Sequence, residues 1–107
     1  MRDMAKPSEH NEHFRQTYPE VWKSFSRLAE QCHDGPLDEK SRRLVKVALA
    51  LGAGLEGGTH SAVRHAREAG ASEAELEHVA VLAITTLGFP AAMRALSWIR
   101  DPQQTKP

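Results

Sequence analysis

The sequence has 107 residues, and its 14 Lys and Arg balance 14 Asp and Glu, so the formal charge is zero. A chain of this length is expected to form one domain around one core. Without a net positive charge it lacks the field that recruits nucleic acid or anionic membranes. We therefore expect neither nucleic acid nor membrane as a partner.

Two further features concern location and redox chemistry. The longest apolar stretch, Val79 to Leu87, falls far short of the ~20 residues that span a bilayer. Residues 1–14 contain no apolar segment of the kind found in signal peptides. The single cysteine, Cys32, can form neither an internal disulfide nor a CxxC pair, and we interpret it as a small filler in a helix. We expect a cytoplasmic protein.

Both ends of the chain are polar and contain proline, so residues 1–7 and 101–107 are predicted to be flexible tails. Residues 8–100 are predicted to form the helical domain. In its first part, Val21, Phe25 and Leu28 recur at helical spacing, and Pro19 suits the first turn of the helix that carries them. The segment Asp34-Gly35-Pro36 is expected to end this helix.

The next helix is predicted from Asp38, a probable N-cap, and from an apolar stripe that ends at Leu51. Four glycines between positions 52 and 58 indicate where this helix stops or bends. The following helix is predicted from about Thr59 to Ala69, because Gly70 is a natural residue just after a helix end.

A fourth helix is predicted from Ser72, which with Glu75 has the spacing of a capping box. This helix is apolar on more than one face from Val79 to Leu87, so we expect neighbouring subunits to cover part of it. Gly88-Phe89-Pro90 precedes a last short helix, from Ala91 to about Ile99. The prediction is an all-α bundle of about five helices that forms a homo-oligomer.

Three successive segments between positions 37 and 98 carry a family resemblance, and they read LDEKSRRLVKVALALGAG, LEGGTHSAVRHAREAGAS and EAELEHVAVLAITTLGFPAAMRALSW. In order, spacing and helix capping this region resembles the carboxymuconolactone decarboxylase and alkylhydroperoxidase D family. The resemblance implies a compact helical fold and assembly as a homotrimer or homohexamer.

The resemblance also shows what this chain lacks. In the peroxidase branch of that family, a glutamate, a CxxC pair and a histidine carry the reaction. The corresponding positions hold Arg43, Leu55, Gly58 and Ala62. Because a thiolate is the nucleophile in peroxide reduction, we do not expect a thiol peroxidase. An antioxidant function of the alkylhydroperoxidase type is the least favoured interpretation.

The decarboxylase branch does without cysteines, and the resemblance leaves it open. It implies a lyase or isomerase acting on a small carboxylic acid, which needs a proton donor and a cationic group for the acid. His60 is the candidate proton donor or acceptor, with Glu56 four residues earlier to tune it. Arg43 is the candidate for holding a substrate carboxylate, and Arg64 and His65 are further binding candidates.

Each candidate also has a structural alternative. If the helix starts at Thr59, Glu56 only stabilises a solvated helix entrance. Arg43 could be an exposed arginine, and Arg64 and His65 could face solvent or another subunit. The whole chain could then be a catalytically silent oligomeric binding or scaffold protein. A cavity at which the candidates converge would favour an enzyme, and a packed site would favour the scaffold.

We expect no metal and no cofactor. Among the six histidines, His10 and His13 with Glu12 form the tightest cluster, but two imidazoles in or beside a polar tail do not close a site. The sequence has neither a dinucleotide-binding GxGxxG nor a P-loop. Redox activity through Cys32 would require a second thiol from another subunit.

Overall fold

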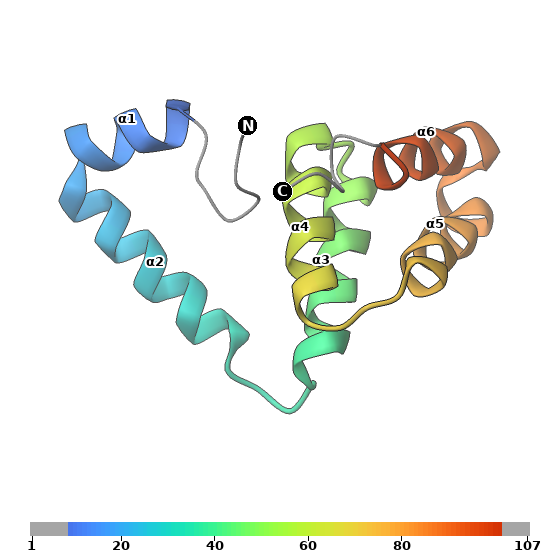
Figure 1. The fold of residues 1–107 in the computed structure, drawn as a ribbon, viewed down its shortest axis with the longest axis horizontal. Helices are drawn as coiled ribbons and strands as arrows, with labels where there is room; N and C mark the ends of the chain where they lie inside the picture. Colours follow the sequence, from blue (N-terminus) through green and yellow to red (C-terminus); the bar gives the residue numbers. More distant parts are fainter. Residues whose placement is uncertain (1–8, 102–107) are drawn as a thin grey trace. The chain divides into compact units, whose positions relative to one another are not determined.

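The computed structural model describes residues 9–101, and all the regular structure in that range is helical (Figure 1). The helices are α1 (Glu9–Thr17), α2 (Pro19–His33), α3 (Glu39–Gly52), α4 (Glu56–Glu68), α5 (Glu73–Leu87) and α6 (Phe89–Ile99). The all-α fold class is confirmed, with one helix more than the five predicted. None of these helices is long and apolar enough to cross a membrane. The predicted tail 1–7 and nearly all of the tail 101–107 lie outside the described residues.

Between residues 9 and 101 the chain forms two compact units, which divide between Leu37 and Asp38. The first unit contains α1 and α2, and the second contains α3 to α6. That residues 8–100 act as a single domain stays a prediction.

The first unit is held by aromatic contacts between its two helices. Phe14 of α1 stacks at 5.2 Å on Tyr18 and lies 6.4 Å from Trp22, measured between ring centroids. The helix predicted from Pro19 is confirmed, whereas α1 was not predicted because its sequence is polar. Cys32 lies in a helix, as predicted, and it is exposed there because α2 buries none of its residues.

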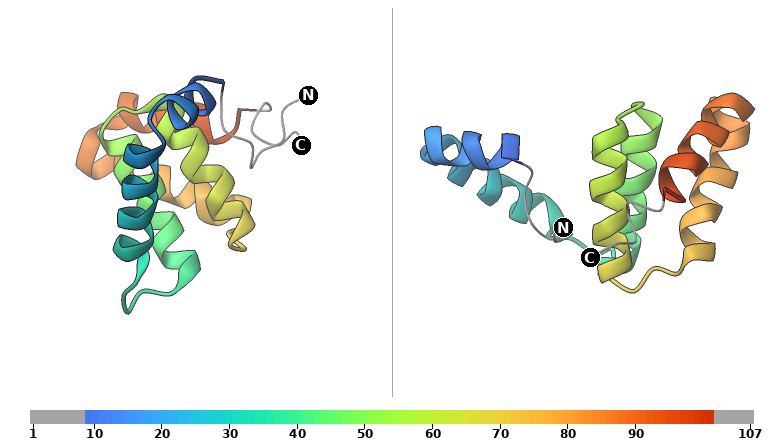
Figure 2. Two further views of the ribbon diagram at one scale, coloured as in Figure 1. Left: turned by 90° about the vertical axis from the view of Figure 1, so that its left-hand side faces the viewer. Right: turned by 45° about the horizontal axis from the view of Figure 1, so that its top comes forward.

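The second unit consists of two helical hairpins, α3 with α4 and α5 with α6, visible from two directions (Figures 1 and 2). Local capping fixes where two of these helices begin. The predicted cap of α3 is confirmed, because an Asp38 carboxylate oxygen accepts a 2.9 Å hydrogen bond from the Ser41 amide. The predicted capping box is also confirmed, since Ser72 and Glu75 exchange hydrogen bonds of 2.8 and 3.1 Å.

Two predicted helix starts were wrong. α4 begins at Glu56, three residues before the predicted start at Thr59, because the Thr59 amide already bonds the Leu55 carbonyl at 2.9 Å. A carboxylate at the first position favours this start, and glycines are tolerated in a first turn. α6 begins at Phe89, two residues before the predicted Ala91, directly after Gly88, whose φ of 97° breaks the chain direction.

The core of the second unit consists mostly of small side chains, which let the helices approach closely. Five of its eleven buried apolar residues are larger than alanine. These are Val47, Leu51, Val63, Leu76 and Ile99. The outward faces of these helices remain apolar in places. A cavity with mostly apolar walls lies between α3 and α5.

Candidate functional site

Arg43 lies in the first half of α3 and is held by its own helix. Its Nε donates a 2.8 Å hydrogen bond to Glu39, and Arg42 donates one of 2.6 Å to the same carboxylate. Hydrogen bonding from Arg43, and then from Arg42, lowers the pKa of Glu39. Arg43 therefore serves as an ion-pair partner one helical turn from Glu39.

The hairpin separates Arg43 from Glu56. Arg43 lies nine residues before Gly52, where α3 ends, and nine residues extend roughly 14 Å along a helix. Glu56 opens α4 just beyond that end of α3. The structure therefore places these two candidates far apart along the α3–α4 pair.

His60 lies one turn into α4, four residues after Glu56, so the two do share one helix. Its Nε2 lies 3.7 Å from an Asp101 carboxylate oxygen, just beyond the end of α6, and its side chain is 18% exposed. This Nε2 is buried and has no hydrogen-bond partner among the described residues. The carboxylate beside His60 is therefore that of Asp101. His60 and Glu56 form neither a hydrogen bond nor an ion pair with each other.

The remaining predicted residues also lie on α4. Arg64 is half-buried and His65 is exposed. Thr59, next to His60, is fully buried, and its hydroxyl has no hydrogen-bond partner within the described part of the chain. α4 thus carries four of the five predicted residues, but the structure does not gather them around a common space.

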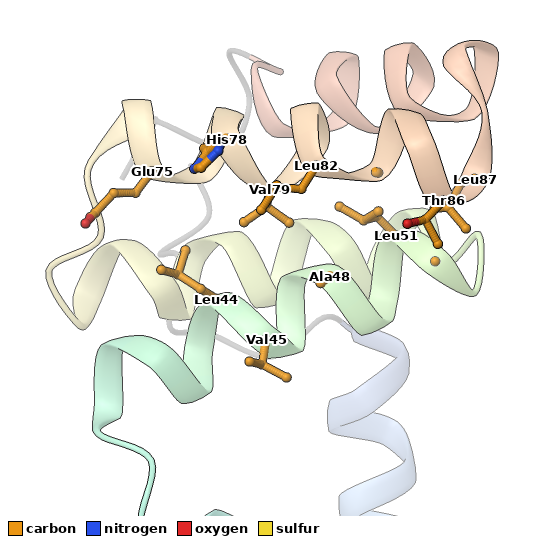
Figure 3. A pocket seen from close by; sticks show the side chains of 12 residues that line it. Leu44, Val45, Ala48, Leu51, Glu75, His78, Val79, Leu82, Thr86 and Leu87 are labelled. Atoms are coloured by element: carbon orange, nitrogen blue, oxygen red, sulfur yellow. The ribbon is translucent and has the colours of Figure 1, made fainter.

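A cavity of about 630 Å³ lies between α3 and α5, and it is open to solvent, since Val45, Leu82 and Leu87 of its lining are 45%, 61% and 40% exposed. Its walls are mostly aliphatic, and Figure 3 shows the side chains that form them. They are Leu44, Val45, Ala48, Leu51, Gly52, Glu75, His78, Val79, Leu82, Ala83, Thr86 and Leu87. The volume falls within the range of about 300–1,000 Å³ that is typical of small-molecule sites.

The polar groups of this cavity are few and lie apart. Glu75 and His78 lie toward one end and Thr86 toward the other (Figure 3). Both Glu75 oxygens are engaged, one by the Ser72 amide at 2.8 Å and the other by the Lys40 ammonium at 2.9 Å. Hydrogen bonding from the Ser72 amide, followed by that from Lys40, lowers the pKa of Glu75. His78 and Thr86 also line the cavity, and their side chains form no hydrogen bond with another residue of the described range 9–101.

None of the five predicted site residues lines the cavity. Their catalytic and binding roles stay predictions. His78 and Thr86 are not among the residues predicted for the site. The sequence does indicate that these residues belong together. A helical period places Glu75, Val79, Leu82 and Thr86 on one face, and His78 lies next to that face.

The described part of the chain contains no candidate metal site. Within residues 9–101 no three His, Cys, Asp or Glu side chains come together as a metal-binding group. His10 and His13 lie exposed on α1.

Residues 19–101 match the family model for the carboxymuconolactone decarboxylase family. The chain belongs to this family. The match covers about three quarters of the sequence and includes α2 to α6. No curated protein and no solved structure matches the chain. In this carboxymuconolactone decarboxylase family member, the positions likened to the CxxC pair are Leu55, the N-cap of α4, and Gly58 in its first turn.

Proposed function

We propose that this family member binds a small organic molecule in the cavity between α3 and α5 and carries out no thiol peroxidase chemistry. The observation that supports this most is the cavity itself, which combines aliphatic walls with His78 and Thr86 as hydrogen-bonding groups. Aliphatic walls supply affinity, and a few polar groups fix the orientation of a ligand.

A thermal-shift screen of small carboxylic acids and neutral organic molecules tests this proposal. A ligand that binds only the folded protein, present at a hundredfold its Kd, stabilises it by about 2.7 kcal/mol. The variant Ala48→Phe fills the cavity and should abolish the shift given by a hit. The matched control Val81→Phe changes an exposed position of α5 outside the cavity lining and should keep the shift. The proposal fails if no compound shifts the wild type or if both variants respond alike.

The absence of thiol chemistry has its own test. Purified protein should show no thiol-dependent reduction of hydroperoxides, because Leu55 and Gly58 carry no thiol and Cys32 has no second cysteine in its own chain. The measurement is peroxide consumption with a dithiol reductant. Turnover that disappears in Cys32→Ser would contradict the prediction.

A second candidate is a lyase or isomerase step on a small carboxylic acid at α4. It is favoured by Nε2 of His60, which is buried, has no hydrogen-bond partner among the described residues and lies 3.7 Å from the Asp101 carboxylate, close enough for a charge interaction with an imidazolium. In this scheme His60 transfers the proton, Glu56 tunes it, and Arg43, Arg64 or His65 binds the acid. Arg43 would first have to leave Glu39.

The variant His60→Ala separates the two candidates. If α4 is the catalytic centre, this change should abolish turnover of an acid found in the screen while helix content by circular dichroism is unchanged. Asp101→Asn should then lower turnover less than His60→Ala does. Full activity in His60→Ala would remove this candidate and leave the cavity proposal untouched.

The proposal also covers the oligomeric state of the protein and its location in the cell. We propose a homo-oligomer, a trimer or hexamer by family resemblance, because Leu49 of α3 and Val81 of α5 are exposed outside the cavity lining. A catalytically silent scaffold would keep that assembly without the ligand. The cytoplasmic location stays a prediction.

A further inference from the structure

The two uncommitted hydrogen-bonding side chains of the cavity, His78 and Thr86, lie eight residues apart on α5. Eight residues extend about 12 Å along a helix. Leu82 stands midway between them, so the space that joins the two polar groups runs along an apolar wall (Figure 3). A molecule that meets both groups must have polar atoms at both ends and an apolar middle.

The charge of the lining indicates a neutral molecule. Among the described residues no Lys or Arg lines the cavity, and the one carboxylate that lines it there, Glu75, has both oxygens occupied by Ser72 and Lys40. An anionic group of a ligand would lie near this carboxylate without a free cationic partner. The negative charge of Glu75 repels a second anion placed beside it, whereas a neutral hydrogen-bonding group meets no such repulsion.

We propose that the cavity takes a neutral, unbranched, mostly apolar molecule about eight carbons long with an oxygen function at each end. One end bonds the His78 imidazole, and the other bonds the Thr86 hydroxyl. The apolar middle packs on Leu44, Val79 and Leu82. This inference rests on the proposed function and names its ligand class.

The test is a calorimetric titration of the full-length protein with four eight-carbon probes. These are 1,8-octanediol, 1-octanol, octanoate and octanedioate. The diol should bind most tightly, about two- to tenfold more tightly than 1-octanol, which is the worth of one net hydrogen bond. Octanedioate should bind most weakly, because both of its ends are charged.

Two neighbouring threonines give a matched pair of variants. Thr86→Val removes the hydroxyl at constant shape and should reduce the preference for the diol over 1-octanol to none, while 1-octanol binding is unchanged. Thr85→Val, at an exposed position outside the lining, should keep the preference. His78→Leu should weaken diol binding in the same way as Thr86→Val.

The outcomes separate this inference from the function on which it rests. Equal binding of diol and 1-octanol, or tightest binding of octanedioate, would overturn the ligand class while a cavity-dependent hit in the thermal-shift screen still stood. No binding by any probe and no screen hit would overturn both. If Thr86→Val changed the mass of the protein in solution and left its preference for the diol unchanged, the cavity would be a contact between copies of the chain. The inference would then be wrong.

Discussion

Glu75 is the side chain that links helix capping to the cavity. It completes the capping box of α5 through the Ser72 amide, binds Lys40 of α3, and lies at one end of the cavity lining. Because the amide and the ammonium favour its charged form, its pKa is lowered in the folded protein. One carboxylate therefore fixes the start of α5 and holds that start against α3.

This lowered pKa predicts a pH dependence. A carboxyl whose folded pKa lies below its unfolded value stabilises the protein above the unfolded value and loses that contribution as the pH falls through the folded pKa. For Glu75 the loss should begin as the pH falls below its ordinary value of 4.5. Urea unfolding at about pH 5.5 and about pH 3 should therefore show a smaller loss of stability in Glu75→Gln than in the wild type.

The matched control for this prediction is Glu68→Gln, which changes an exposed carboxyl at the end of α4. It should keep the wild-type dependence on pH. Identical pH dependence in Glu75→Gln and the wild type would show that ionisation of the Glu75 carboxyl does not stabilise the folded protein.

At the scale of elements, Arg67 connects three helices. From the last turn of α4 its guanidinium donates two hydrogen bonds, of 2.6 and 2.8 Å, to Glu73 at the start of α5. A further hydrogen bond of 3.2 Å reaches the carbonyl of Ile99 at the end of α6. The arginine thus neutralises a carboxylate and satisfies a helix-terminal carbonyl at the junction of the two hairpins.

Replacing Arg67 with lysine should lower the free energy of unfolding by about 1 kcal/mol, because an ammonium cannot keep the bidentate geometry and also reach the carbonyl. Chemical denaturation is the measurement. Arg100→Lys is the control, since Arg100 and Glu77 lie 3.7 Å apart on the surface, where ion pairs contribute little. An effect of Arg67→Lys no larger than that of the control would contradict the role of this junction.

At the scale of the whole molecule, the exposed apolar side chains indicate that another protein surface covers them. On α2 alone, Val21, Phe25 and Leu28 are all more than half exposed. On the second unit, Leu49 and Val81 lie exposed outside the cavity lining. Water-exposed apolar area on this scale favours self-association.

We therefore expect light scattering at micromolar concentration to give a mass that is a multiple of 11.9 kDa. Val81→Glu should lower this mass by placing a charge in the contact, whereas Glu68→Lys, at an exposed polar position at the end of α4, should not. A wild-type mass of one chain would remove the predicted assembly.

Much of the fold was predictable from the sequence because helix limits depend on residues within one turn. Asp38, Ser72 and Gly88 act on amides and dihedral angles close to them in the chain, and their predicted effects are confirmed. The pairing of Arg43 with Glu39 had the same local basis, since the two are four residues apart.

Only the tertiary structure decided where a ligand could be held. The cavity exists because α3 and α5, separated in sequence by all of α4, lie beside each other and present aliphatic faces to a common space. The same packing brings Asp101 to His60 and leaves Glu56 and Arg43 apart. The sequence determined which residues share a helix face, because that follows from a period of 3.6 residues. Which faces meet depends on how side chains of distant helices fit together, and no local pattern contains that information.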